Sequence, residues 1–192
     1  MINKFCLGLT GRMASGKGEI VKVLERKGFK YISLSDIVRE RAAKEGGIQT
    51  RSRMQDIGNQ LRSEGGAGVL GKKVRERIES LSEQKWVIDG IRNPEEIKEL
   101  RKINRFFLIA VLSERKIIID RLINRSRNTD AANIDELNRR LDREWGIGEP
   151  DGGQQVGRCI EEADFKLNNN GTVDELEKEI IKLLLLIEGE NG

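Results

Sequence analysis

Short apolar runs alternate along this chain with longer segments in which apolar residues recur every three or four positions. The short runs are five to eight residues long and predict strands at Phe5 to Leu9, Phe29 to Ser33, Lys85 to Asp89, Arg105 to Leu112 and Ala163 to Leu167. The spacing in the longer segments is that of amphipathic helices with one buried face. Strands that alternate with helices favour a three-layer α/β/α fold, in which helices cover both faces of a parallel sheet of about five strands.

The longest segment of helical spacing lies between the second and third predicted strands, from about residue 35 to residue 82. Glycine pairs at Gly46-Gly47 and Gly65-Gly66 interrupt it, so we expect three helices with short breaks that form a flap. Further helices are expected from Asn93-Pro94 to about Arg101, from Ser113 to about Arg125, from about Ile134 to Trp145 and from Val173 to Ile187.

The remaining segments are assigned to a loop and a lid. The polar stretch 126–133 is expected to form a short lid, and the sequence GIGEPDGGQQVG at 146–157 is predicted to be a loop. A chain of 192 residues fits one domain of generous size. We therefore expect a single domain over 1–192, with its core in 1–34, 83–125 and 134–192, the flap in about 35–82 and the lid in about 126–133.

A glycine-rich turn follows the first predicted strand and precedes a helix. Its glycines are spaced as Gly11-x4-Gly16, and Lys17 comes directly after them. In this P-loop arrangement, backbone N–H groups surround a phosphate, and the helix dipole and a lysine add positive charge. The alternative is a glycine-rich surface turn with an incidental lysine, but the flanking strand and helix argue against it. The first hypothesis is phosphate binding by Gly11, Arg12, Met13, Ala14, Ser15, Gly16, Lys17, Gly18 and Glu19.

Two acids are expected at the same edge of the sheet as the glycine-rich turn. Asp36 follows the second predicted strand, and Asp89 ends the third. Each acid precedes an arginine by three residues, namely Arg39 and Arg92. Ligands of parallel sheets bind at the carboxyl ends of the strands, so these residues and the turn are predicted to converge. Two ordinary surface ion pairs are the alternative interpretation.

Arginines are concentrated on both sides of the polar stretch 126–133. They are Arg121, Arg125, Arg127, Arg139, Arg140 and Arg143. The planar guanidinium suits phosphate oxygens, and closure of a lid would carry these cations over a transferring phosphoryl group while excluding water. A solvated helix face is the alternative at this charge density.

Composition narrows the chemistry and the partners. The chain contains no histidine, so its chemistry must come from Asp, Glu, Lys and Arg. The 35 basic and 32 acidic residues are interspersed and give a net charge of only +3, which implies no nucleic-acid partner. Cys6 and Cys159 lack metal-ligand spacing and are interpreted as buried thiols of a reducing compartment. No signal peptide or membrane-spanning run is evident, so we expect a cytoplasmic protein with no membrane partner. We expect it to be a monomer or a homodimer.

The chain resembles the nucleoside monophosphate kinases and their relatives over nearly its whole length, including adenylate kinase and deoxynucleotide monophosphate kinases. Adenylate-kinase-like enzymes carry a glycine directly after the loop lysine, as Gly18 does here, whereas Glu19 stands where they usually have Thr. DG-x-R, which ends at Arg92, is similar to their segment for magnesium-bound water and acceptor phosphate. DRLINR, which ends at Arg125, is similar to their lid-entry arginines.

Other motifs point to different relatives within this group. NNNGT, at 168–172, is similar to the family's adenine-contacting turn and implies nucleotide contacts at Asn170 and Gly171. GLTG-x4-GK followed by SDIVR is similar to dephospho-CoA kinase, in which the residue matching Asp36 would be the catalytic base. GQQV followed by AD resembles P-loop nucleotide-kinase-like domains of deoxycytidylate metabolism. These relatives act on different substrates, so the motifs do not identify one acceptor.

The residues and the resemblance together predict an ATP-dependent phosphotransferase acting on a (deoxy)nucleoside monophosphate, with Mg²⁺ held through water at Asp89. The predicted catalytic residues are Lys17, Asp36, Arg92, Arg121 and Arg125. Beside the glycine-rich turn, the residues predicted to bind ATP are Arg121, Asn170 and Gly171. The residues predicted to bind the acceptor are Asp36, Arg39, Arg62, Asp89, Arg92, Arg127 and Arg140.

Two other functions stay open. Dephospho-CoA is the second candidate acceptor, and in that case Asp36 could take a proton from the acceptor hydroxyl. A P-loop NTPase that hydrolyses or senses nucleotide is a candidate from another class, and the missing Ser or Thr after Lys17 favours it. Against this class, the chain has no NKxD motif and no glutamate beside Asp89 to activate water.

Overall fold

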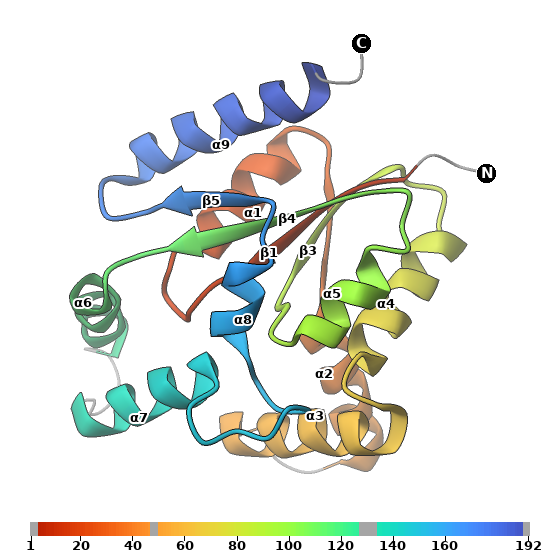
Figure 1. Ribbon diagram of the computed structural model, residues 1–192, viewed down its shortest axis with the longest axis vertical. Coiled ribbons are helices and arrows are strands. Elements are labelled where there is room, and N and C mark those ends of the chain that lie inside the picture. The colour runs from red at the N-terminus through yellow and green to blue at the C-terminus, as the bar shows by residue number, and fades with distance from the viewer. Residues whose placement is uncertain (1–3, 47–49, 127–133, 190–192) are drawn as a thin grey trace.

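Five parallel strands form one sheet at the centre of the protein. The computed structural model describes residues 4–46, 50–126 and 134–189. The strands are β1 (Phe5–Thr10), β2 (Lys30–Ser33), β3 (Lys85–Asp89), β4 (Arg105–Leu112) and β5 (Phe165–Asn168), in the order β2-β3-β1-β4-β5. β1 is central, where Leu7 is in register with Val87 of β3 and Phe107 of β4. This sheet confirms the predicted fold class (Figure 1).

Helices cover both faces of the sheet. They are α1 (Lys17–Arg26), α2 (Leu34–Glu45), α3 (Arg51–Gly65), α4 (Val69–Ser80), α5 (Pro94–Leu100), α6 (Arg115–Ser126), α7 (Ile134–Trp145), α8 (Val156–Glu161) and α9 (Val173–Gly189). α1 and α9 lie together on one face, whereas α2, α4, α5 and α8 lie on the other (Figure 1). The three helices predicted between the second and third strands are observed as α2, α3 and α4.

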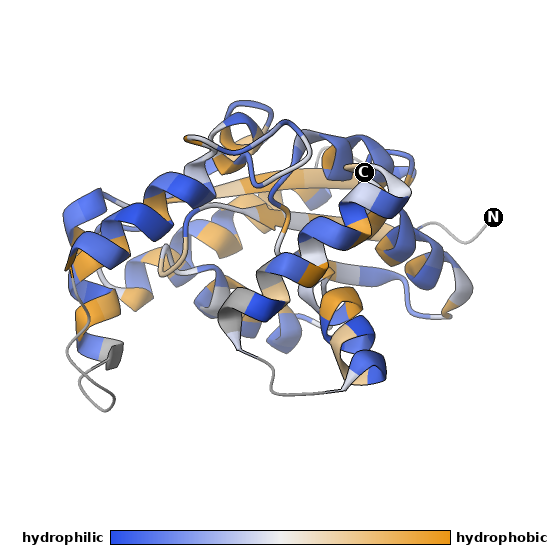
Figure 2. Cartoon of the chain, turned by 90° about the horizontal axis from the view of Figure 1, so that it is seen from below, coloured by the Kyte–Doolittle hydropathy of each residue, from blue (hydrophilic) through white to orange (hydrophobic). Residues whose placement is uncertain are grey.

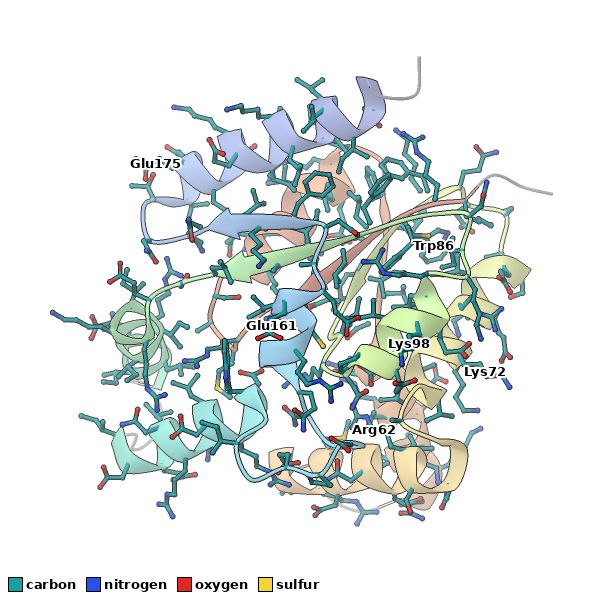
Figure 3. All side chains as sticks on the ribbon, viewed as in Figure 1. Arg62, Lys72, Trp86, Lys98, Glu161 and Glu175 are labelled. Carbon is teal, nitrogen blue, oxygen red and sulfur yellow. The ribbon has the colours of Figure 1, made fainter. Side chains whose placement is uncertain are left out.

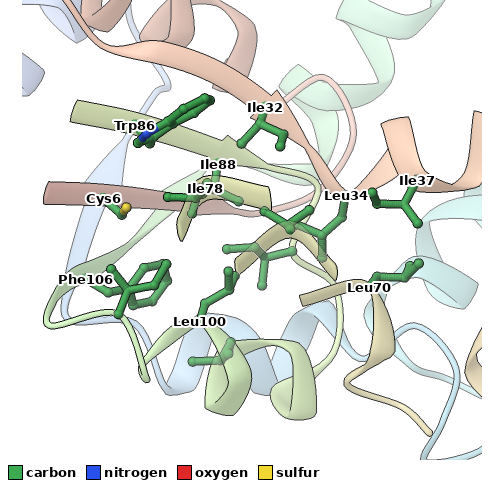
Figure 4. Packing of buried hydrophobic residues seen from close by; sticks show 14 of the residues in the cluster. Cys6, Ile32, Leu34, Ile37, Leu70, Ile78, Trp86, Ile88, Leu100 and Phe106 are labelled. Carbon is green, nitrogen blue, oxygen red and sulfur yellow. The ribbon is translucent and has the colours of Figure 1, made fainter. Parts of the chain in front are cut away.

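Each face of the sheet has its own apolar core. Leu9 and Ile109 pack with Leu24 of α1 and Ile180 of α9 on the first face. On the second face, Ile88 packs with residues of the flap and α5, and Figure 4 shows this cluster around Trp86, Leu70 and Leu100. Figure 2 shows the hydropathy of the residues: the strands inside are apolar, and the outer faces of the helices are hydrophilic. Burial on both faces explains why the central strands are continuous apolar runs.

Helix α8 was not predicted, and it shortens the loop that was expected at 146–157: residues 146–155 form the loop, and the last two positions belong to the helix. The helix begins at Val156, and its apolar residues Val156 and Ile160 pack against Ala110 of β4. A helix of six residues is too short to show a hydrophobic period, so its sequence resembles that of a loop. α8 packs on the sheet directly after Gln154 and so fixes the position of this residue, which lines the candidate site.

Candidate active site

The glycine-rich turn joins β1 to α1 at the carboxyl edge of the sheet. Gly11 has φ +134° and Gly16 has φ +106°, values that favour glycine. A Cβ atom at Gly11 would lie 2.3 Å from the carbonyl oxygen of Val111, and one at Gly16 would lie 2.0 Å from Nδ2 of Asn169. Both glycines are therefore required by the shape of the turn, which we call the phosphate loop.

Lys17 opens α1 and folds back over the phosphate loop. Its Nζ donates to the carbonyl oxygens of Gly11 at 2.7 Å and Arg12 at 2.8 Å. Burial lowers the pKa of Lys17 because it disfavours the charged form, while the nearby carboxylates of Asp89 and Glu144 act in the opposite direction. A cation held between the loop and two acids is placed where phosphate oxygens would be bound.

The two unusual residues after Lys17 differ in their surroundings. A Cβ atom at Gly18 would meet no atom within 4 Å, so packing does not demand glycine there. The carboxylate of Glu19 makes an ion pair with Lys22 at 3.0 Å, one turn further along α1. The Glu19 side chain is therefore directed along the helix surface.

Three side chains hold the phosphate loop in place through hydrogen bonds to backbone carbonyl oxygens. Nδ2 of Asn169 donates to the carbonyl oxygen of Ser15 at 2.8 Å, and this asparagine is 5% exposed. Arg121 donates to the carbonyl oxygens of Ala14 at 3.3 Å and Asn169 at 2.9 Å. The hydroxyl of Ser113 donates to the Asn169 carbonyl oxygen at 2.7 Å. Arg121 was predicted to bind ATP and to take part in catalysis, and here it donates to backbone carbonyl oxygens. Asn169 lies within the predicted NNNGT turn but was given no role, and Ser113 was not identified from the sequence.

The predicted adenine-contacting turn lies beside this support. Oδ1 of Asn170 accepts a hydrogen bond from the backbone N–H of Glu114 at 2.9 Å, which ties the turn to the start of α6. A Cβ atom at Gly171 would lie 1.9 Å from Oε2 of Glu175, so the turn is close-packed at its other end. Because Asn169, within this turn, donates to the carbonyl oxygen of Ser15, the turn and the phosphate loop are neighbours.

Asp89 ends β3, and its carboxylate and the guanidinium of Arg92 both lie near Lys17. Oδ1 of Asp89 accepts a hydrogen bond from the backbone N–H of Gly90 at 2.7 Å. Nη1 of Arg92 donates to Oε1 of Glu144 at 2.8 Å and to Oε1 of Gln154 at 3.0 Å. The guanidinium therefore has a fixed position next to the phosphate loop.

Glu144 is the main site residue that the sequence analysis missed. It lies in the last turn of α7, is 2% exposed, and accepts a hydrogen bond from the backbone N–H of Met13 at 2.7 Å. The neighbouring Trp145 stacks under the Arg12 guanidinium at 4.4 Å from the ring centroid. The only sequence signal was an acid among the arginines of a predicted helix, which is also the pattern of a solvated surface.

A cavity of about 840 Å³ adjoins the phosphate loop and is bounded by the flap, α7 and the segment after β3. Its apolar wall is formed by Met13, Leu34, Val38, Met54 and Leu70. Its arginines are Arg39, Arg62, Arg92, Arg139, Arg140 and Arg143. Four of the residues predicted to bind an acceptor thus line one cavity, namely Arg39, Arg62, Arg92 and Arg140.

Arg62 and Asp36 already have structural partners. Arg62 projects from α3 (Figure 3). Its Nη2 lies 2.9 Å from Oε1 of the buried Glu96 on α5. Asp36 accepts a hydrogen bond from the backbone N–H of Ser33 at 2.9 Å and thereby caps α2. Its carboxylate also pairs with Arg39, and Asp36 does not line the 840 Å³ cavity. The predicted role of Asp36 in binding an acceptor therefore has no direct support in the geometry.

Some predictions lie outside the described residues. The lid beyond Ser126 is among them, as are Arg127 and the side chain of Arg125. In the part of the chain that the structure describes, no three His, Cys, Asp or Glu side chains are grouped as a metal site. None of the described helices is long and apolar enough to cross a membrane.

The fold and the phosphate loop define a P-loop domain, and comparisons with known proteins agree. A family model described as an AAA domain matches residues 10–138. A UPF0200 protein of Sulfurisphaera tokodaii is 35% identical over 93% of this chain and 94% of its own length. Another, from Methanothermobacter thermautotrophicus, is 32% identical over 95% of this chain and 90% of its own. The chain therefore belongs to the UPF0200 family.

Solved structures share the fold at low sequence identity. TT1252 from Thermus thermophilus superposes with a TM-score of 0.61 at 17% identity, over 95% of this chain and 97% of that one. Shikimate kinase from Acinetobacter baumannii gives 0.59 at 13% identity, over 98% and 96%. Dephospho-CoA kinase from Campylobacter jejuni gives 0.52 at 15% identity, over 96% and 97%. The predicted resemblance is thus confirmed at the level of the fold, which this chain shares with shikimate kinase and dephospho-CoA kinase.

Proposed function

We propose that this protein is an ATP-dependent phosphotransferase that moves the γ-phosphoryl group of ATP to a (deoxy)nucleoside monophosphate. The observation that carries the proposal is the arginine-lined cavity, which begins at Met13 of the phosphate loop. A donor bound by the loop and an acceptor bound in the cavity would meet between Met13 and Arg92. Phosphoryl transfer needs this arrangement, because the attacking and leaving oxygens lie roughly in line.

The donor side would be the phosphate loop. Its backbone N–H groups and the N-terminus of α1 suit the β- and γ-phosphates of ATP. Lys17 would exchange its two carbonyl partners for phosphate oxygens. The carboxylate of Asp89 lies close enough to Lys17 to favour its charged form, and carboxylate oxygens suit Mg²⁺. Asp89 would hold the ion through water, and the ion would neutralise phosphate charge.

The acceptor side combines positive charge with an apolar wall. Arg39 of α2 and Arg140 of α7 face the cavity from opposite sides, and their side chains are 54% and 44% exposed. Guanidinium groups bind phosphate oxygens in pairs of hydrogen bonds. Met54 of the flap is partly exposed and provides apolar surface on which a planar base could pack. A volume of about 840 Å³ is sufficient for a molecule of nucleotide size.

The surroundings of Asp36 favour a phosphate acceptor over a hydroxyl acceptor. A hydroxyl acceptor, such as dephospho-CoA or shikimate, needs a general base within hydrogen-bond reach. Asp36 was the sequence candidate for that base, but it caps α2 and lies outside the cavity lining. A phosphate acceptor needs arginines more than a base, and the cavity has six of them.

A coupled assay of ADP release tests the proposal directly. Wild-type protein would be supplied with MgATP and, in separate reactions, with each (deoxy)nucleoside monophosphate, dephospho-CoA, shikimate or no acceptor. Nucleoside monophosphates are expected to stimulate turnover most. ATP turnover that no acceptor changes would refute the kinase function and favour the NTPase alternative. Stimulation by dephospho-CoA or shikimate alone would show that the enzyme phosphorylates a hydroxyl group and not a nucleoside monophosphate.

Substitution of the loop lysine checks that turnover belongs to this site. Lys17→Ala is expected to abolish ADP release, since the ammonium lies at the centre of the phosphate loop. Lys30→Ala removes an exposed ammonium from the start of β2 and serves as the matched control. Retained activity in a folded Lys17→Ala protein would place the phosphate site elsewhere.

A further inference from the structure

Glu144 joins the two halves of the proposed site. Its Oε2 atom accepts a hydrogen bond from the backbone N–H of Met13 in the phosphate loop at 2.7 Å. Its Oε1 atom accepts one from Nη1 of Arg92 at 2.8 Å. The Glu144 side chain is 3% exposed, so both contacts are shielded from water. One carboxylate thus fixes the distance between the loop and an arginine of the acceptor cavity.

The same helix end makes a second, independent contact with the phosphate loop. Trp145 lies under the guanidinium of Arg12, 4.4 Å from the ring centroid. α7 also presents Arg143, directly before Glu144, and Arg140, one turn earlier, to the cavity. The C-terminal end of α7 is therefore docked on the donor side, while its other face forms a wall of the acceptor side.

We propose that Glu144 is a positioning residue for phosphoryl transfer, which holds Arg92 in register with the phosphate loop. This inference rests on the proposed function. An arginine that bridges an acceptor phosphate and a transferring phosphoryl group is effective only at one place, and errors of about 1 Å can cost a hundred-fold in rate. Gln154 also accepts a hydrogen bond from Arg92, at 3.0 Å, but it has no contact with the phosphate loop among the described hydrogen bonds. Glu144 alone of these two supplies the link to Met13.

A competing explanation makes a different kinetic prediction. A carboxylate on Arg92 could simply compete with the acceptor phosphate for the guanidinium. Its removal would then tighten acceptor binding and leave the rate of transfer unchanged. A positioning residue has the opposite signature, because loss of register affects the transition state and not the affinity of the ground state.

The variant Glu144→Gln separates these explanations. Glutamine has the same size but only one oxygen acceptor, so it cannot accept from both the Met13 N–H and Arg92. We expect kcat for acceptor-dependent turnover to fall about ten- to a hundred-fold, with the acceptor KM within about three-fold of wild type. Unchanged kcat, with or without a lower acceptor KM, would overturn the proposal. A wild-type protein without acceptor-dependent turnover would refute the proposed function itself, and with it this role.

A double-mutant cycle tests whether Glu144 acts through Arg92. In an Arg92→Ala background, Glu144→Gln is expected to lower kcat by less than about three-fold, because the group it positions is gone. A full additive loss in that background would overturn the proposal. Glu99→Gln is the matched control, since Glu99 pairs with Arg75 and Lys102 away from the cavity and its loss should leave kcat unchanged. If Glu144→Gln does not fold, Glu144→Asp keeps the charge but shortens the link, and unchanged kcat in that variant would overturn the proposal equally.

Discussion

Replacement of Glu96 by Gln is expected to be among the most destabilising conservative substitutions in this chain. Glu96 is fully buried on α5 and its carboxylate accepts four hydrogen bonds. Oε1 receives Nε of Arg62 at 3.3 Å and Nη2 at 2.9 Å, and Oε2 receives the backbone N–H groups of Arg92 at 2.8 Å and Asn93 at 3.1 Å. This carboxylate therefore ties the flap to the segment that positions Arg92.

The magnitude follows from the burial of both partners. Glutamine retains one acceptor oxygen and turns an NH2 group toward two donors, so either Arg62 or the backbone pair loses its acceptor. The side chain of Arg62 is only 8% exposed, and a buried charge without its partner costs about 3–5 kcal/mol. For a chain of 192 residues, each kcal/mol lowers Tm by about 2–4 °C. The expected decrease in Tm is therefore about 6–20 °C.

Thermal and urea unfolding followed by circular dichroism measure this effect. Glu99→Gln, three residues along the same helix, is the control, because its side chain is 21% exposed and surface ion pairs contribute about 0–1 kcal/mol. The double variant Arg62→Met with Glu96→Gln removes the orphaned cation, so it should be more stable than Glu96→Gln alone. An unfolding free energy of Glu96→Gln within about 1 kcal/mol of the wild-type value would refute the reasoning, because the Arg62–Glu96 pair would then contribute little to folding.

Two further predictions concern the phosphate loop and the thiols. Gly16→Ala should destabilise the protein by more than about 1 kcal/mol, whereas Gly18→Ala should be neutral or stabilising. Of these two glycines, only Gly16 combines a positive φ with a close neighbour. Equal unfolding free energies of the two variants would contradict this prediction. Burial raises the pKa of Cys6 to about 12 and also raises the pKa of Cys159. Both thiols therefore stay protonated at pH 8 in the folded chain and should react with a disulfide reagent only in denaturant, so rapid labelling of native protein would count against their burial.

The sheet and the phosphate loop could be predicted because their signals are local. The central strands β1, β3 and β4 are short apolar runs, and the loop is defined by Gly11, Gly16 and Lys17 at fixed spacing. The three flap helices were likewise indicated by glycine pairs that break a helical period. The short helix α8 was missed because six residues give no period to detect.

The partners of the site residues could not be predicted because they lie far apart in sequence. Glu144 reaches Met13 across 131 positions, and Asn169 reaches Ser15 across 154. The spacing of Asp36 and Arg39 correctly indicated a local ion pair, but the sequence could not distinguish a helix cap from a catalytic acid. Tertiary contacts assign such roles, and no local pattern encodes them.

The state of the cavity arginines indicates which of them an acceptor would engage. Arg62 and Arg92 pair with carboxylates that are nearly inaccessible to water, and breaking such pairs is costly. Arg39 and Arg140 pair with Asp36 and Glu136 near the surface, where an ion pair contributes little. A phosphate can therefore replace the surface carboxylates at low cost. The pair of Arg62 with Glu96 keeps the shape of the site, and Arg92, whose side chain is 30% exposed, can reach a phosphoryl group while it stays paired with Glu144. Because Arg39 belongs to the flap and Arg140 to α7, an acceptor bound by both would draw these two walls together over the phosphate loop.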